Sequence, residues 1–221
     1  MKMIKLCVFD LDGTTVDTLA SIAYFANRIL ERNGYETFPV DDYRRLAGGG
    51  SKKLWNNISG RRGIPDDLNE KFREEWIAEY AADYMHLTLP FTGVAEMLTD
   101  LRKAGIATAI VTNKDKRIAD RICGTLFPGL LDDVVSDHPG MILKPDPGEI
   151  LSLGEKYGAQ GRQLLYCGDH EIDMITGKRA RALTVGVTWG FFPEDKLREA
   201  GADEIAFTPA DVTRIAISKG Q

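Results

Sequence analysis

The fold is decided by residues 6–14, which read Leu6-Cys7-Val8-Phe9-Asp10-Leu11-Asp12-Gly13-Thr14. The first four of these residues are all apolar, as in a parallel strand that is covered on both faces. Polar residues begin where this strand would end. In an open α/β sheet, the carboxyl ends of the strands form the edge at which ligands bind. The stretch therefore predicts a buried strand that leads into a binding site.

Three further motifs follow apolar runs later in the chain, in a fixed order. They are Thr112-Asn113, Lys144-Pro145, and Gly168-Asp169 with Asp173 four residues on. We expect each motif to lie just past the carboxyl end of a strand, and hence at one edge of the same sheet. That edge would gather four carboxylates, a hydroxyl, an amide and a lysine. Such a set suits phosphoryl transfer through a carboxylate nucleophile with a divalent metal.

The chain after Pro90 alternates strictly between strand-like and helix-like segments. The expected strands are 106–112, 134–135, 164–167, 184–187 and 205–207. The expected helices are 94–104, 115–126, 148–157, 173–182, 194–200 and 210–218. Alternation of this kind implies a parallel, doubly wound sheet with helices on both faces. The predicted fold class is therefore α/β.

A long insert separates the first strand from the second. The gap between residues 6–9 and 106–111 far exceeds the roughly dozen residues that a crossover helix requires. The pattern of apolar residues inside the gap is helical. We therefore predict two domains, a Rossmann-like α/β core of residues 1–15 and 89–221 and a helical cap of residues 16–88.

The cap should contain four helices around a glycine-rich loop. The first helix would be capped by Asp17 or Thr18 and would end at Gly34, and the second would be a short helix at 41–47. The third would be capped by Ser51, and the fourth would span 66–87. Glycines let a backbone approach closely, so we expect the loop at 48–50 to face the site. Gly49 and Lys52 are predicted to contact substrate, or else Lys52 and Lys53 are solvated lysines on a helix. Trp55 is expected either inside the cap or at a dimer contact.

Composition narrows the class of protein. The 221 residues include 28 Lys and Arg against 33 Asp and Glu, a net charge of −5, which argues against a nucleic-acid surface. Three cysteines make no disulfide framework, and Cys7 and Cys167 are expected in the core. We see no signal-peptide core in residues 1–9 and no apolar run of the roughly 20 residues that a membrane span needs. A cytoplasmic protein is therefore expected, with His170 as a loop residue.

The pair Asp10 and Asp12 carries the first chemical hypothesis. Their carboxylates point the same way in an extended chain, and at about 4 Å they would repel by roughly 4 kcal/mol. A magnesium ion between Asp10 and a substrate phosphate would offset this repulsion, while Asp12 exchanges a proton with the leaving oxygen. Gly13 permits a tight turn, and Thr14 is expected to orient the loop by hydrogen bonding. Taken alone, the motif could also be a strand that ends in a turn.

Each of the other motifs has a structural alternative. Thr112 offers a hydroxyl and Asn113 an amide donor to a phosphate oxygen, or both cap the following helix. Lys144 would bring a cation to the phosphoryl oxygens, or it is an ordinary solvated lysine. Asp169 and Asp173 suit a metal ligand and its supporting carboxylate, or they favour a helix amino end. Four coincidences in this order are less plausible than one site.

Together the motifs resemble those of the haloacid dehalogenase superfamily of phosphotransferases, over essentially the whole chain. The resemblance implies a helical cap, a nucleophile at Asp10, an acid/base at Asp12, and phosphate contacts from Thr112 and Lys144. It implies Mg²⁺ ligands at Asp10, the backbone carbonyl of Asp12, Asp169, and Asp173 as a support or ligand. The dehalogenases of the superfamily lack the second aspartate, so the presence of Asp12 disfavours cleavage of carbon–halogen bonds.

A narrower resemblance is to the phosphoglycolate phosphatase branch. The segments that carry it are Thr112-Asn113-Lys114, Lys144-Pro145-Asp146-Pro147 and Thr188-Trp189-Gly190. Thr15 and Ala182 depart from common patterns of the branch, where an aliphatic residue and glycine are usual. Neither position should carry chemistry, so these departures bear on the subfamily and not on the activity.

The expected function is a magnesium-dependent phosphatase that hydrolyses a small phosphomonoester through an aspartyl-phosphate. Its predicted substrate contacts are Gly13, Gly49, Lys52, Thr112, Asn113 and Lys144. Three alternatives remain: a phosphomutase that uses the same intermediate, a pyrophosphatase or nucleotidase, and a non-catalytic phosphate-binding module. The expected partner is a small phosphorylated metabolite, with no nucleic acid or membrane, and the protein would be a monomer or a homodimer.

Overall fold

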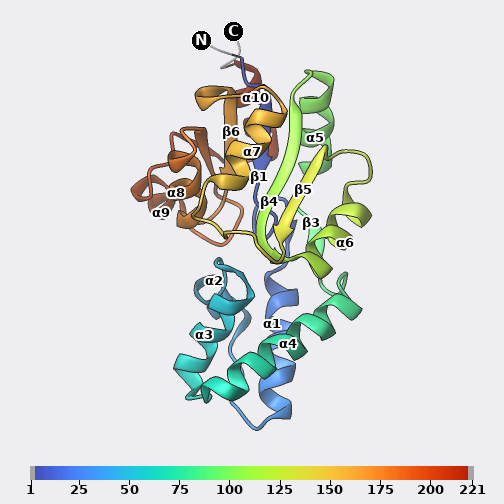
Figure 1. Cartoon of the computed structure of the whole chain (residues 1–221), viewed down its shortest axis with the longest axis vertical. Coiled ribbons are helices and arrows are strands. Elements are labelled where there is room, and N and C mark those ends of the chain that lie inside the picture. Colours follow the sequence, from blue (N-terminus) through green and yellow to red (C-terminus); the bar gives the residue numbers. More distant parts are fainter. Residues whose placement is uncertain (1–2, 219–221) are drawn as a thin grey trace.

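The core of the molecule is a six-stranded sheet, seen in a computed structural model that describes residues 3–218 (Figure 1). Its strand order is β5-β4-β1-β6-β7-β8. The strands are β1 (Leu6–Phe9), β4 (Ala107–Asp115), β5 (Asp133–Asp137), β6 (Leu164–Gly168), β7 (Leu183–Val187) and β8 (Glu204–Ala206). Neighbouring strands of this sheet all run parallel, which confirms the predicted α/β class.

Helices cover both faces of the sheet, as the alternating residues of β1 require. The helices of the core are α5 (Val94–Lys103), α6 (Lys116–Leu126), α7 (Gly148–Lys156), α8 (Glu171–Arg179), α9 (Glu194–Glu199) and α10 (Pro209–Ser218), with a 3₁₀ turn at Gly161–Gln163. Cys7 and Phe9 pack in one apolar cluster with residues of α5, α6 and α10. Leu6 and Val8 pack in a second cluster with residues of α7. The sheet is therefore doubly wound.

The strand β4 is longer than its apolar run predicts. The expected strand stops at residue 112, whereas β4 continues to Asp115 with an irregularity between Val111 and Asp115. The polar residues after Val111 stay extended because Asp115 pairs with Asp137 of β5. Thr112 and Asn113 therefore lie within the last part of the strand and not beyond it.

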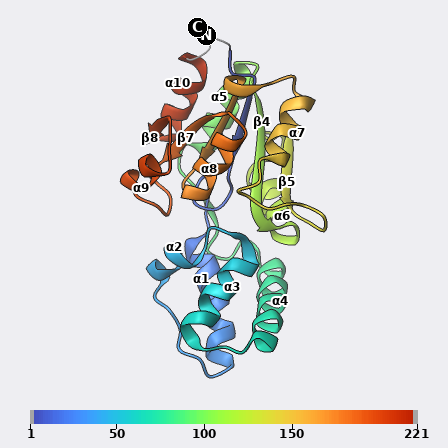
Figure 2. The same cartoon turned by 60° about the vertical axis from the view of Figure 1, so that its left-hand side comes forward.

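The segment between the first two core strands forms a helical lobe below the carboxyl edge of the sheet (Figures 1 and 2). Its helices are α1 (Leu19–Arg32), α2 (Tyr43–Leu46), α3 (Gly50–Arg62) and α4 (Asp66–Ala82), with a 3₁₀ turn at Val40–Asp42. We call this lobe the cap. Its interior is aromatic: Trp55 meets Phe72 with ring centroids 6.0 Å apart, and Trp76 meets Tyr80 at 5.4 Å. Trp55 is fully buried, so it packs inside the cap.

Two details of the cap differ from the predictions. The helix α4 ends at Ala82, five residues before the expected Leu87, which itself has a positive φ of 52° that no helix tolerates. The helix α3 begins at Gly50, and its N-cap Gly49 has no side chain to make a capping bond. Ser51 is therefore inside the first turn, and its hydroxyl accepts a hydrogen bond from Arg73 instead.

A two-stranded antiparallel ribbon joins the cap to the core. It pairs β2 (Val16–Asp17) with β3 (Leu89–Pro90). Thr18 is the N-cap residue of α1, as expected, but its hydroxyl makes no capping bond and donates to Asp12 instead, at 2.7 Å. Both connections between the lobes therefore run side by side, next to the first motif.

Burial of the small and apolar residues follows the sequence pattern. Cys7 and Cys167 are buried and unpaired, as expected for core packing, and Cys123 is buried as well. Among residues 3–218, no helix is both long and apolar enough to cross a bilayer.

Asp203, just before β8, is expected to contribute to stability in a pH-dependent way. Burial alone would raise the pKa of its carboxyl, but hydrogen bonds from Lys178 and Thr184 lower that pKa from 3.8 to about 2. A folded-state pKa below the unfolded value stabilises the fold above pH ~4, and this stabilisation is lost as pH falls towards 2. We expect Asp203→Asn to lower the free energy of unfolding by about 2 kcal/mol at pH 7.

Urea denaturation at pH 7 and pH 3 measures this effect. The difference between the wild type and Asp203→Asn should shrink by about half at pH 3. Asp195→Asn is the matched control, because Asp195 is exposed and its loss should change stability by no more than about 0.5 kcal/mol. A difference that is the same at both pH values would contradict the assignment.

Candidate active site

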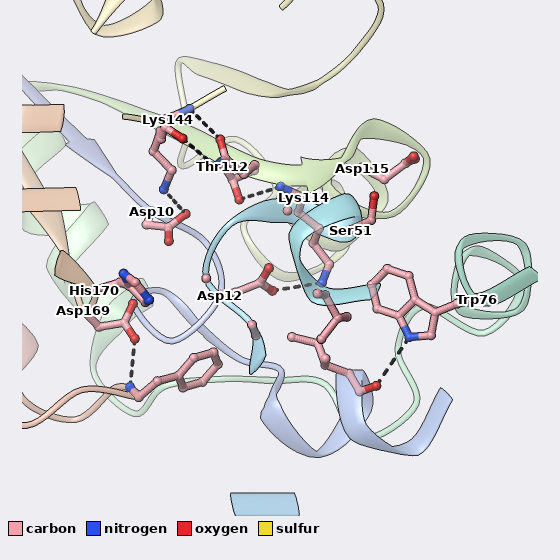
Figure 3. A pocket seen from close by; sticks show the side chains of 17 residues that line it. Asp10, Asp12, Ser51, Trp76, Thr112, Lys114, Asp115, Lys144, Asp169 and His170 are labelled. Atoms are coloured by element: carbon pink, nitrogen blue, oxygen red, sulfur yellow. Dashed lines mark hydrogen bonds and ion pairs between the residues drawn. The ribbon is translucent and has the colours of Figure 1, made fainter. Parts of the chain in front are cut away.

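The four sequence motifs meet at the carboxyl edge of the sheet, where the core faces the cap (Figure 3). Asp10 follows β1, Thr112 lies in β4, Lys144 lies in the loop before α7, and Asp169 lies between β6 and α8. These residues line one cavity together with residues of the cap. The parallel order of the strands produces this convergence, because all their carboxyl ends point the same way.

Asp10 is held rigidly at the end of β1. Its backbone N–H donates to the carbonyl of Cys167 in β6, at 2.9 Å. Its Oδ1 accepts from the N–H of Leu11 at 2.7 Å and pairs with Nζ of Lys144 at 2.9 Å. Both donors meet the same oxygen, which leaves Oδ2 without a protein donor among residues 3–218. The carboxylate is therefore oriented through one oxygen and has the other available for chemistry.

Lys144 is a buried cation between two carboxylates, and not a solvated surface lysine. Its Nζ lies 2.9 Å from Oδ1 of Asp10 and 2.8 Å from Oδ1 of Asp173, and its side chain is 2% exposed. Burial disfavours the charged form, but the two carboxylates outweigh it and hold the pKa of Lys144 well above its usual value. Tyr166 donates to the same oxygen of Asp173, at 3.2 Å.

Asn113 fixes the loop that carries this lysine. Its Oδ1 accepts from the backbone N–H of Lys144 at 2.9 Å, and its Nδ2 donates to the carbonyl of Lys144 at 3.2 Å. The amide that we expected to meet a phosphate oxygen is therefore engaged with the protein. Neither Thr112 nor Asn113 caps α6, because Asp115 does so by accepting from the N–H of Arg117 at 2.9 Å.

The side chain of Asp169 lies against the backbone at two glycines, Gly13 and Gly190. Its Oδ1 accepts from the hydroxyl of Thr14 at 2.8 Å, and its Oδ2 accepts from the N–H of Phe191 at 2.8 Å. A Cβ on Gly13 would lie 2.2 Å from Oδ2 of Asp169, and one on Gly190 would lie 2.3 Å from its Cβ. Only glycine fits at these positions. Thr14 thus orients the loop as predicted. Gly13, with a φ of 78°, allows the predicted tight turn and lets the backbone approach Asp169 closely.

The acidic residues suit a divalent cation. One carboxylate oxygen each from Asp10, Asp169 and Asp173 lie within 4.8 Å of one another. Burial raises the pKa of Asp10 to about 7 despite Lys144, and burial together with Asp173 raises that of Asp169 well above its usual value. If all three carboxylates are ionised beside one lysine, two negative charges remain, which either bound protons or a cation must balance. A hard cation with oxygen ligands is the species that such a group of acids fits.

Asp12 lies apart from this cluster and has its own partners. Its Oδ1 accepts from the hydroxyl of Thr18 at 2.7 Å and pairs with Nζ of Lys114 at 2.9 Å. Burial opposes the charge on Lys114, yet Asp12 raises the pKa of that ammonium group above its usual value. Lys114 lines the cavity, although the sequence analysis used it only as part of a resemblance and gave it no role.

The glycine loop of the cap approaches the core closely. A Cβ on Gly48 would lie 2.4 Å from the ring of His170, and one on Gly50 would lie 2.9 Å from the carbonyl of Asn113. The loop therefore faces the site as predicted. Gly49 and Lys52 are not among the residues that line the cavity, since Gly49 lies against Lys53 and the side chain of Lys52 is exposed. Their predicted contacts with substrate stay predictions, with no support from the lining of this cavity.

His170 belongs to the site although its sequence context indicated only a loop. It is buried at the N-cap of α8, where its Nδ1 accepts from the N–H of Ile172 at 3.1 Å. Burial lowers the pKa of the imidazole, which matches this neutral, accepting role. Its ring packs on Phe192 with centroids 4.1 Å apart. The ring thus forms a wall of the cavity beside Asp169.

The rest of the cavity wall is largely apolar. It comes from four residues of the cap and one of the core, namely Ile22, Ala47, Leu54, Trp76 and Phe191. Oxygen and nitrogen atoms are concentrated on the core side, where the carboxylates and lysines lie. The cavity therefore has one polar end, suited to phosphate, and one apolar end that would surround the rest of a ligand.

Comparisons with known proteins agree with this arrangement. The sequence model of the haloacid dehalogenase-like hydrolase family matches residues 7–187. The chain is 28% identical over 216 residues to a phosphoglycolate phosphatase of Aquifex aeolicus, with 96% of each chain covered. It is 29% identical over 216 residues to an N-acetylmuramic acid 6-phosphate phosphatase of Pseudomonas aeruginosa, covering 95% of this chain and 93% of that one.

Solved structures resemble the whole chain, cap included. A crystal structure from Lactobacillus delbrueckii subsp. bulgaricus, named as a candidate phosphoglycolate phosphatase, superimposes with a TM-score of 0.90. It is 25% identical in sequence, and the match covers 98% of this chain and 99% of that one. The chain belongs to the haloacid dehalogenase-like hydrolase family, in which it resembles the phosphoglycolate phosphatase branch, and it is a phosphoric monoester hydrolase.

Proposed function

We propose that the chain is a magnesium-dependent phosphatase that acts on a small phosphomonoester through an aspartyl-phosphate at Asp10. The observation that carries this proposal is the state of the Asp10 carboxylate. One of its oxygens is fixed by Leu11 and Lys144, and the other has no protein donor among the described residues. A carboxylate held in this way is oriented for attack on phosphorus along one direction.

The remaining side chains have roles that follow from their positions. Oδ2 of Asp10 would attack phosphorus in line with the bond to the leaving oxygen, while Asp12 gives that oxygen its proton. Asp12 then takes a proton from the water that hydrolyses the aspartyl-phosphate. Lys144 and the hydroxyl of Thr112 would stabilise the charge on the phosphoryl oxygens. The cap excludes bulk water from the cavity while these steps occur.

Mg²⁺ is the cation that we propose for the acidic cluster. Asp10, Asp169 and Asp173 would hold it, with the backbone carbonyl of Asp12 as a further ligand. When bound, it would neutralise the phosphate and bring it close to the nucleophile. The buried charge of the three carboxylates supports this assignment, and the hard oxygen ligands favour Mg²⁺ over softer metals.

Phosphoglycolate is our first choice of substrate. Several relatives carry the name phosphoglycolate phosphatase, among them those of Aquifex aeolicus and Vibrio parahaemolyticus. The relative of Pseudomonas aeruginosa acts on a much larger sugar phosphate, so the shared fold alone does not define the leaving group. A small metabolite as partner, a cytoplasmic location, and a monomer or homodimer remain predictions of the sequence.

Phosphate release across a panel of phosphoesters tests the proposal. The panel holds phosphoglycolate, sugar phosphates, nucleotides, pyrophosphate and para-nitrophenyl phosphate. We expect release with magnesium, a loss of at least about 100-fold with a chelator, and recovery when magnesium is restored. Release that is insensitive to the chelator would contradict the role of the acidic cluster.

The same panel separates the alternatives. A phosphomutase would act on β-glucose 1-phosphate, require a bisphosphate activator and release little free phosphate. A pyrophosphatase or nucleotidase would prefer pyrophosphate or nucleotides. Folded protein that releases no phosphate from any compound would favour the mutase or a non-catalytic phosphate-binding module.

A further inference from the structure

Lys114 makes contacts that the proposed reaction does not yet use. It lies in the last part of β4, and its side chain is only 3% exposed. Nζ lies 2.9 Å from Oδ1 of Asp12 and 3.2 Å from the hydroxyl of Tyr80, and 4.4 Å from the centre of the Tyr80 ring. Asp12 belongs to the core, whereas Tyr80 belongs to α4 of the cap. The ammonium group therefore connects the two lobes at the acid/base.

The backbone of Lys114 is held as firmly as its side chain. Its N–H donates to the hydroxyl of Thr112 at 3.2 Å, inside the same cavity. The side chain crosses from this point to Asp12, as Figure 3 shows. A lysine that is buried in this way has few alternative rotamers, so its ammonium group defines one position for the carboxylate that it meets.

The acid/base requires such support. Asp12 follows β1 on a turn, and its side chain is 21% exposed, more than the 12% of Asp10 or the 0% of Asp173. Among residues 3–218, the carboxylate of Asp12 accepts hydrogen bonds from Thr18 and from Lys114, and both end on Oδ1. Oδ2 is then the oxygen that can exchange a proton with the leaving group. Proton transfer needs hydrogen-bond geometry, and a displacement of about 1 Å can cost 100-fold in rate.

We propose that Lys114 is a positioning residue that orients Asp12 toward the leaving oxygen, and that Tyr80 of the cap keeps Lys114 in place. The proposal deepens the phosphatase function and rests on it. It gives Lys114 no contact with the phosphoryl group, because Lys144 is the lysine proposed to contact the phosphoryl oxygens. The acid step therefore depends on the cap through Tyr80 as well as through the shape of the cavity.

Leaving groups of different basicity provide the test. Para-nitrophenolate leaves without a proton, whereas the alkoxide of an alkyl phosphate needs one. The value of kcat/KM reports the step in which the leaving group departs, with magnesium present. We expect Lys114→Met to lower kcat/KM for phosphoglycolate, or for the best alkyl ester of the panel, by about 100-fold. For para-nitrophenyl phosphate the loss should stay below about threefold.

Two further variants keep the test decisive. Lys116→Met is the matched control, because this lysine lies two residues on and is exposed. Within residues 3–218 its ion pair is with Asp120 alone, so kcat/KM for both substrates should be unaffected. Tyr80→Phe keeps the ring and removes the hydroxyl, and it is the variant that tests the proposal if Lys114→Met does not fold. It should lower kcat/KM by about threefold to tenfold for the alkyl ester, and leave the aryl ester unchanged.

Several results would overturn the proposal. Equal losses for the two esters in folded Lys114→Met would assign the lysine to phosphate binding or to structure. If kcat/KM for both esters is unchanged in Lys114→Met, then Asp12 needs no such support. If only Tyr80→Phe folds, the same result in that variant leads to the same conclusion. A wild type that hydrolyses neither ester fails earlier, at the proposed phosphatase function, and is recognised before any variant is measured.

Discussion

Asp10→Asn is expected to abolish turnover, with a fall in phosphate release of about 10⁴-fold or more. The side chain keeps its shape, but an amide is a poor nucleophile and cannot form the aspartyl-phosphate. Phosphate release from the best substrate, with magnesium, measures the effect. Mass spectrometry of acid-quenched protein should find a phosphoryl group on the wild type and none on the variant.

The fold should survive this change. Lys144 keeps its partner Asp173 at 2.8 Å, and the cluster loses one of its mutually repelling buried charges. We therefore expect the thermal midpoint of Asp10→Asn, without metal, to equal or exceed that of the wild type. Asp100→Asn is the control, because this acid is exposed and its ion pair in the described part of the chain is with Lys103 alone. Residual turnover within tenfold of the wild type would remove Asp10 from the role of nucleophile.

Lys144→Met should harm both stability and activity. Methionine is close to lysine in length but leaves Asp10 and Asp173 without the cation that lies 2.9 and 2.8 Å from them. Removing one partner of a buried ion pair lowers the free energy of unfolding by about 3–5 kcal/mol. We expect a value at the lower end of this range, because the two carboxylates can take up protons. The loss of a cation at the phosphoryl oxygens should lower kcat by at least about 100-fold.

Magnesium distinguishes this effect from a simple packing defect. A divalent cation binds the folded protein more strongly when the neighbouring lysine is gone, so it should raise the thermal midpoint of Lys144→Met more than that of the wild type. Lys156→Met is the control: Lys156 is 57% exposed beside Asp133, and its loss should cost less than about 1 kcal/mol. An unchanged midpoint in Lys144→Met would show that the carboxylates do not depend on the lysine.

The α/β class and the convergence of the motifs could be predicted from the sequence because both depend on local patterns. Continuous apolar runs mark buried parallel strands, and parallel strands place whatever follows them at one edge. That reasoning placed Asp10 and Asp169 at one edge of the sheet, where the structure has them. Lys144 lies at the same edge, but the prediction that a strand precedes it directly is wrong, because residues 141–143 form no strand and Ile142 is exposed. It also predicted burial of Cys7 and Cys167, because both lie within apolar runs.

The contacts between distant residues could not be predicted in this way. Lys114 looks like any polar residue that follows a strand, and only the folded chain brings Tyr80 and Asp12 to its ammonium group. Asn113 was expected to meet the ligand, but its amide is equally able to hold the backbone of Lys144, and the sequence contains no signal that separates the two. The sequence did not predict that His170 belongs to the cavity wall, because its position there depends on packing against Gly48 and Phe192.

The cysteines of the chain lie in the core, whereas most of its tryptophans lie in the cap, so each lobe has its own reporter group. All three cysteines lie in the core and are inaccessible, and burial raises the pKa of Cys123 to about 12, which suppresses its thiolate further. Two of the three tryptophans, Trp55 and Trp76, belong to helices of the cap and are buried, Trp55 inside the cap and Trp76 at the wall of the cavity. Labelling by a thiol reagent therefore reports opening of the core alone. Indole fluorescence is weighted towards the cap, so the unengineered protein carries separate reporters for the unfolding of each lobe.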